Sequence, residues 1–244
     1  MGIEGSGHSV SVGIMQKGVP LGELFNNSGL PGSQILLHSI DQLLDQCRIE
    51  KENLQGICVT LGPGSFTSMR ICLAVAEALG MGLQIPVYGI DELTLTANTV
   101  PFYPFPIKVI KSAYKGEFYT AGFSTSSGIA QRLDELHLVT PQTFLENLDP
   151  NELVLGNGLN QLLSGEVALE WKKARWNVSF SRKVGGINVI EYFLDTPAKE
   201  PSTIPLEPIY IRPSEAELNY ERHFGISKKK ISAQDSQKGP TPGT

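Results

Sequence analysis

The sequence has few residues of the kind that bind metal ions or form disulfides. It holds three cysteines and four histidines among 244 residues. Cys47, Cys58 and Cys72 are odd in number and lie far apart inside apolar patterns. The histidines show no HxxH, HxxxH or HExxH spacing. We therefore predict neither a disulfide framework nor a metal site, and expect the cysteines to be small core residues.

Positive charge is also scarce. The sequence holds 20 Lys and Arg residues and 25 Asp and Glu residues, which gives a net charge of -5 and a pI near 5.4. Nucleic-acid binding depends on neutralising phosphates, so this balance argues against a protein that holds nucleic acid by itself. It leaves open membership of a complex that does so.

Long uninterrupted apolar runs are absent. The longest apolar stretch is interrupted by Arg70 and Glu77, and so falls short of the roughly 18 residues that a membrane span needs. The first residues lack the basic and apolar segments of a signal peptide. We expect a soluble cytoplasmic protein with no membrane association.

What the sequence does contain is one long apolar unit, from Ile57 to Ile85. Its first residues, Ile57 to Leu61, are rich in β-branched side chains and too few for a helix, which predicts a strand buried on both faces. Gly62-Pro63-Gly64 then breaks the strand. A helix with a hydroxyl cap at Ser65 or Thr67 should follow and run to about Gly82.

This predicted helix is apolar nearly all round. Between Met69 and Leu83 only Arg70 and Glu77 are charged. A helix that lies on a sheet needs one apolar stripe about 100° wide. The additional apolar surface predicts that a second element or another protein covers another side of the helix.

The rest of the first half predicts a mixed α/β lobe. Residues 3–15 indicate a hairpin and residues 21–27 a third strand, and Gln34 to Cys47 is amphipathic at helical spacing. A strand at 86–90 and a short helix capped by Asp91 come after the central unit. Strand, helix and strand in this order imply a parallel pair.

The pattern restarts after the proline cluster VPFYPFP at 100–106. Strands are expected near 107–113, 117–124, 136–139 and 153–155, and helices after Thr140-Pro141, after Gly156-Asn157-Gly158 and over 187–194. We predict a first lobe at 1–102, a second at 103–195 and a return segment at 196–218 with a strand-like run at 209–212. A disordered tail at 219–244 carries the solvated triplet Lys228–Lys230.

The turn between the central strand and helix is a candidate anion site. Backbone amides at a helix start can hold a phosphate, and Arg70 could add charge. The candidate residues are Gly62, Gly64, Ser65, Thr67 and Arg70. The turn lacks the Walker ending, so glycines that merely reverse the chain explain it equally well.

The role of Glu4 has two explanations, and the two nearby serines are not predicted to be nucleophiles. Glu4, at a strand end beside the glycines of Gly5-Ser6-Gly7, is either an acidic group next to a phosphate loop or an exposed carboxylate. Ser65 and Ser6 do not sit in a GxSxG elbow, so no catalytic residue is predicted.

The segment GICVTLGPGSFTSMRI at 56–71, followed by IPVYGI at 85–90, resembles the YeaZ/TsaB-type family of bacterial tRNA threonylcarbamoyladenosine biosynthesis. The resemblance is strong over residues 33–95 and diffuse to about 212. It implies a two-lobed actin/sugar-kinase/Hsp70-like ATPase fold, with a ribonuclease H-like motif in each lobe.

The resemblance also implies a role. Members are non-catalytic scaffold subunits that bind the TsaD-type transferase through the two helices at 34–47 and 67–82, help recruit a TsaE-type ATPase and meet tRNA only indirectly. No tightly bound cofactor is expected, and ATP or ADP would lie at the subunit junction. The partner interface expected here comprises Leu36, Leu37, Ile40, Leu43, Met69, Leu73, Ala76 and Glu77.

The sequence departs from the family in several places. Its first strand is short, which suggests a truncated or misassigned start, and Glu4 replaces Asp. Ser68 and Cys72 stand where Gly is common, which we expect to alter the approach of the helices. Competing hypotheses are a stand-alone ATPase or phosphotransferase, a peptidase, and a homodimer formed through the same apolar face when the partner is absent.

Overall fold

The computed structural model describes residues 1–7, 9–164, 177–178, 184–196, 200–202 and 204–211. The tail expected at 219–244, the lysine triplet within it and the return segment beyond residue 211 lie outside the described residues.

The first half of the chain forms a mixed five-stranded sheet in the order β3-β2-β1-β4-β5. β1 pairs antiparallel with β2 and parallel with β4, so that Ile3 stands opposite both Val12 and Val59. The expected hairpin and parallel strand-helix-strand unit are confirmed. The strands are β1 (Gly2–Glu4), β2 (Val10–Gln16), β3 (Val19–Asn26), β4 (Ile57–Thr60) and β5 (Val87–Ile90).

The second sheet repeats this plan. β6 pairs antiparallel with β7 and parallel with β10, just as β1 pairs with β2 and β4. This repetition confirms the predicted two-lobed actin/Hsp70-like fold, with a ribonuclease H-like motif in each lobe. The strands are β6 (Ile107–Ser112), β7 (Phe118–Ser124), β8 (Gln131–Arg132), β9 (His137–Val139), β10 (Leu153–Leu155) and β11 (Asn177–Val178).

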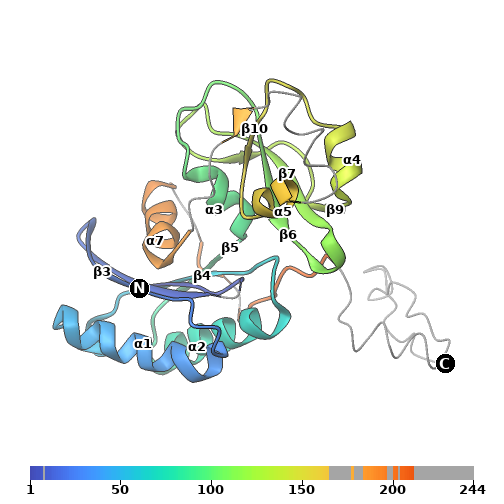
Figure 1. The fold of residues 1–244 in the computed structure, drawn as a ribbon. Helices are drawn as coiled ribbons and strands as arrows, with labels where there is room; N and C mark the ends of the chain where they lie inside the picture. The colour runs from blue at the N-terminus through green and yellow to red at the C-terminus, as the bar shows by residue number, and fades with distance from the viewer. Residues whose placement is uncertain (8, 165–176, 179–183, 197–199, 203, 212–244) are drawn as a thin grey trace, which may run out of the picture. The chain divides into compact units, whose positions relative to one another are not determined.

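Helices cover both faces of the first sheet (Figure 1). α1 (Gly32–Cys47) and α2 (Phe66–Leu83) pack side by side on one face, where Leu36, Leu43 and Leu73 join the core. The opposite face is covered by α7 (Gly186–Asp195), through Val189 and Tyr192. The helix was expected, but it packs on the first sheet and not with the second half as predicted.

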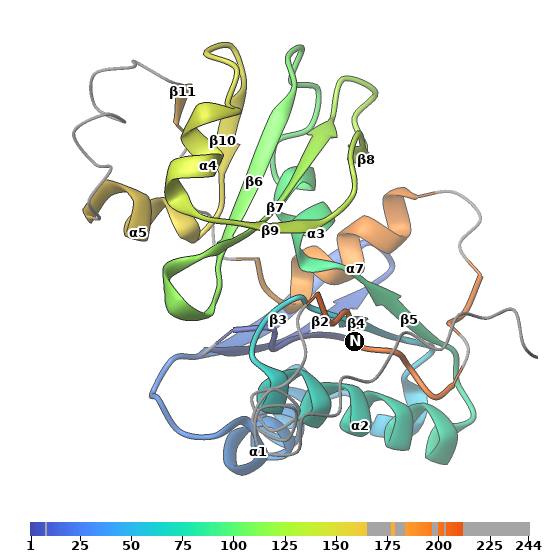
Figure 2. The same cartoon turned by 90° about the vertical axis from the view of Figure 1, so that its right-hand side faces the viewer.

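The second sheet has its own helices (Figure 2). α3 (Glu92–Asn98) packs on one face, with Leu93 in the core formed by Ile107 and Phe123. α4 (Pro141–Glu146) and α5 (Gly158–Ser164) cover the other face. Short 3-10 turns lie at Lys51–Asn53 and Tyr114–Gly116. α3 follows β5 of the first sheet but packs on the second sheet, and α7 follows β11 of the second sheet but packs on the first, so the chain crosses between the lobes twice. The lobe boundaries themselves stay a prediction.

Two caps agree with the sequence and one does not. The Asp91 carboxylate accepts the Thr94 N–H at 2.8 Å, and the Thr140 hydroxyl accepts the Thr143 N–H at 3.2 Å. Ser65 occupies the N-cap position of α2, but its side chain makes no capping bond. The start of α2 is therefore held by contacts of its turn rather than by a hydroxyl cap.

The described part of the return segment lies against the first lobe. The Ser202 N–H donates to Val87 O and the Ile209 N–H to Leu61 O, both at 2.8 Å. Residues 209–211 form no strand, so the strand-like run predicted there is wrong for the described residues.

The expectation that no apolar stretch reaches the length of a membrane span is wrong: α2, with 18 residues and two charges, is long and apolar enough by length and composition. In the fold it lies along the first sheet and buries Met69, Cys72 and Ala76. Packing in a folded lobe therefore explains part of the apolar composition of α2.

Candidate functional site

The turn from Gly62 to Ser65 is held closely by the rest of the chain. Gly62 has a φ of 97°, and a Cβ there would overlap the Met69 sulfur. Gly64 lies against Ser6, where a Cβ would overlap the Ser6 carbonyl oxygen. The Ser65 N–H donates to that same oxygen at 2.8 Å. The glycines are thus required by close packing, and a donor that could have bound an anion is already used.

Arg70 does not add charge to this turn. Its guanidinium lies 4.0 Å from the centre of the Phe66 ring, and its Nε donates to the Tyr210 hydroxyl at 2.9 Å. The Phe66 and Tyr210 rings stack 4.9 Å apart. This stack attaches the return segment to the start of α2, so the structural explanation of Arg70 fits the contacts seen. Thr67 is exposed on the first turn of the helix.

A buried charged cluster lies where the two lobes meet, beside the turn. The Ser6 hydroxyl donates to Glu4 Oε1 at 2.5 Å and accepts from Lys111 Nζ at 2.7 Å. Lys111 Nζ is also 3.3 Å from Glu92 Oε2. All four residues are at least nine-tenths buried. Glu4 is therefore neither an exposed carboxylate nor a free acid beside a phosphate loop.

The cluster changes the acidity of Glu4. Burial raises the pKa of the Glu4 carboxyl above its usual value, and the charge of Lys111 and the hydrogen bonds from Ser6 offset only part of that effect. Glu92 Oε2 accepts no hydrogen bond among the described residues, so its compensation is the nearby ammonium of Lys111. Sequence reasoning missed Lys111 and Glu92. The only available signal was a lysine inside the apolar strand pattern IKVIKS at 107–112.

The predicted partner interface is largely wrong. Six of its eight residues are at most 4 % exposed, because five of them join the first core and Met69 packs against the Gly62 turn. They are Leu36, Ile40, Leu43, Met69, Leu73 and Ala76. Leu37 is 55 % exposed on α1, and Glu77 is half-buried because its carboxylate accepts the Leu206 N–H of the return segment. Cys72 is likewise buried and faces Gly5, so it does not alter a helix approach at an outer surface.

The excess apolar surface of α2 nevertheless exists, on its opposite side. We call this the outward α2 face. Its residues recur at helical spacing and are exposed, apart from the half-buried Ile71. Met81 is 67 % exposed. The face consists of Thr67, Ile71, Ala74, Ala78, Met81 and Gly82.

The fold and the site define a class of protein: a two-lobed chain with the actin/Hsp70-like fold, in which the turn before α2 is held by internal contacts and one face of α2 is apolar and exposed. Residues 32–171 match the family model described as tRNA N6-adenosine threonylcarbamoyltransferase, TsaD. The chain belongs to this family, and within it is of the TsaB/YeaZ type.

Individual relatives of the chain come from the same family. The chain is 26% identical over 134 residues to the tRNA threonylcarbamoyladenosine biosynthesis protein TsaB of Bacillus subtilis, covering 54% of this chain and 58% of that one. It is 29% identical over 100 residues to the tRNA N6-adenosine threonylcarbamoyltransferase of Syntrophus aciditrophicus, covering 38% and 30%. The chain thus spans less than two thirds of the length of these curated relatives.

Solved structures show the same fold. A Pseudomonas aeruginosa protein described as similar to the peptidase YeaZ superposes with a TM-score of 0.69 at 19% identity, covering 86% of this chain and 97% of that one. YeaZ from Pseudomonas aeruginosa superposes with a TM-score of 0.63 at 19% identity, covering 78% and 87%.

Proposed function

We propose that this chain is a non-catalytic cytoplasmic subunit of the system that forms N6-threonylcarbamoyladenosine in tRNA, and that it binds a TsaD-type transferase. The observation that carries the proposal is the outward α2 face, an apolar surface that the chain's own sheet leaves exposed. The likeness to both TsaB and the transferase supports the pathway. In this role a TsaE-type ATPase would join the complex, and tRNA would be met indirectly.

The internal contacts of the turn support the non-catalytic part of the proposal. The Ser65 N–H donates to the Ser6 carbonyl oxygen, and the Arg70 guanidinium lies over the Phe66 ring and donates to the Tyr210 hydroxyl. A stand-alone ATPase or phosphotransferase would need such groups for its substrate. Nucleotide bound at the junction between two subunits stays a prediction, which titration of the complex with Mg-ATP would test.

Charge placed on the outward α2 face tests the partner. Ala74→Glu and Ala78→Glu should each weaken binding of the transferase from the same organism by about 100-fold or more, because an unpaired carboxylate would be buried in an apolar contact. Calorimetry gives the affinity. Leu133→Glu is the matched control, since Leu133 is 58 % exposed on the second lobe. Equal affinities for all three variants and the parent chain would refute the assigned face.

A further inference from the structure

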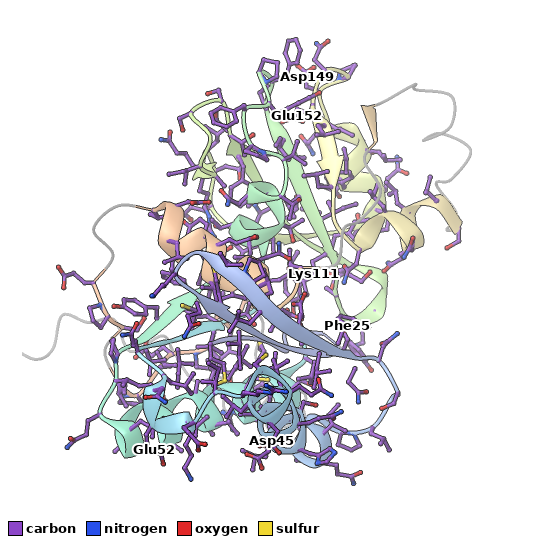
Figure 3. All side chains as sticks on the ribbon, turned by 90° about the vertical axis from the view of Figure 1, so that its left-hand side faces the viewer. Phe25, Asp45, Glu52, Lys111, Asp149 and Glu152 are labelled. Carbon is purple, nitrogen blue, oxygen red and sulfur yellow. The ribbon has the colours of Figure 1, made fainter. Side chains whose placement is uncertain are left out.

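Lys111 joins segments that are far apart in the chain. It lies on β6 of the second sheet, and in Figure 3 it is found where the two sheets meet. Its ammonium contacts the Ser6 hydroxyl of the turn after β1 and the Glu92 carboxylate at the start of α3. One side chain therefore connects the first sheet, the second sheet and a helix that follows the first sheet.

These contacts are mutually dependent. A buried ammonium or carboxylate is strongly disfavoured unless it is paired and hydrogen-bonded. Glu92 Oε2 accepts no hydrogen bond from the described residues, and Lys111 is its charge partner. If the two lobes moved apart at this point, the Lys111 and Glu92 charges and the Ser6–Glu4 pair would lose their buried arrangement together. The cluster therefore opposes separation of the lobes.

The same cluster uses the groups that would bind a phosphate. The Ser6 carbonyl oxygen accepts a hydrogen bond from the Ser65 N–H, and the Ser6 hydroxyl oxygen accepts one from the Lys111 ammonium. Backbone amides at a helix start together with a lysine make up a common phosphate site. Here these donors are satisfied inside the chain, on a turn that already lies against Gly64.

We propose that Lys111 is an internal latch, which holds the Ser6 turn to Glu92 and keeps the space between the lobes closed to phosphate groups. This inference concerns the buried contacts of Lys111 and not the outward α2 face, so it is independent of the transferase partner.

Hydrogen-deuterium exchange on the full chain tests the latch. Lys111→Met should raise the exchange of peptides that contain residues 2–7 and 61–66 by about tenfold or more, because local opening becomes easier. Lys108→Gln is the matched control. Lys108 lies on the same strand but pairs with Asp134 at 2.5 Å within the second lobe. If Lys111→Met folds and its exchange is unchanged, the latch is refuted.

Two further variants keep the test valid if Lys111→Met does not fold. Ser6→Ala removes the two hydrogen bonds of the hydroxyl, to Glu4 and from Lys111, and should also raise exchange in the 61–66 peptide. Glu92→Gln removes one charge that holds Lys111, and should increase the affinity for Mg-ATP at least about tenfold over the parent chain by releasing the ammonium. Unchanged exchange in Ser6→Ala refutes the latch, and unchanged Mg-ATP affinity in Glu92→Gln refutes the exclusion of phosphate.

Discussion

Leu73→Ala should destabilise the chain by about 2–5 kcal/mol, the range for truncating a buried leucine. Leu73 is 4 % exposed and packs in the first core together with Leu36, which is 1 % exposed. The neighbouring Ala74→Glu should change stability by no more than about 0.5 kcal/mol, since Ala74 is exposed on α2. Adjacent positions are thus expected to give opposite phenotypes.

Urea unfolding followed by circular dichroism measures both effects. A loss of about 3 kcal/mol corresponds to a fall in melting temperature of about 6–12 °C for a chain of this size. Leu73→Ala, assayed well below its melting temperature, should keep its affinity for the transferase, whereas Ala74→Glu should lose it. A neutral Leu73→Ala together with a destabilising Ala74→Glu would show that Leu73 faces outward, and Leu73 would again be a candidate for the interface.

Three other predictions concern buried polar groups. Glu77→Ala should lower stability by about 1–3 kcal/mol in urea unfolding by leaving the Leu206 N–H without its acceptor, while Glu77→Gln keeps an acceptor and should cost less. Cys72 is fully buried and burial raises its pKa to about 12, so native-state alkylation followed by mass spectrometry should label the half-buried Cys47 first. Burial raises the folded-state pKa of Glu4 above the unfolded value of about 4.3. The stability that protonated Glu4 contributes is therefore fully present below about pH 4.3, and it is lost as the pH rises through the folded-state pKa. Glu4→Gln should remove this loss in urea midpoints recorded across that window, and an unchanged pH dependence would contradict the assignment.

Local patterns predicted the elements well because each is specified by nearby residues. The helix expected at 67–82 is observed at 66–83, and Asp91 caps the next helix as its side chain and spacing indicate. The fold class followed from the resemblance and was confirmed by the repeated sheet plan.

Which side of α2 faces the core was not predictable in the same way. A helix that is apolar on every side has no polar face to mark the solvent, so residue type alone could not place Leu73 inside and Ala74 outside. Two clues were available: Arg70 is exposed, and the outward residues are mostly small. Glu77 gave the contrary signal because its carboxylate binds a backbone N–H from a segment far along the chain.

The Lys111 cluster depends on non-local contacts altogether. At strand spacing, Lys111 shares a face of β6 with the core residues Ile107 and Val109, so the alternation places it on a buried face. It is buried because the turn at Ser6, 105 residues away, covers it. The pattern in β6 indicates the face on which Lys111 lies but does not identify Ser6 as its contact.

The size of α2 limits what a partner can contact. An 18-residue helix is about 27 Å long, so a face about 10 Å wide offers roughly 270 Å². A standard interface buries about 800 Å² on each partner. A stable complex therefore cannot rest on the outward α2 face alone, and must extend over neighbouring surface. Leu37, 55 % exposed on the adjacent α1, and the Phe66–Arg70–Tyr210 stack at the start of α2 are the flanking surfaces of the right chemistry, since aromatic and arginine side chains contribute strongly to interfaces.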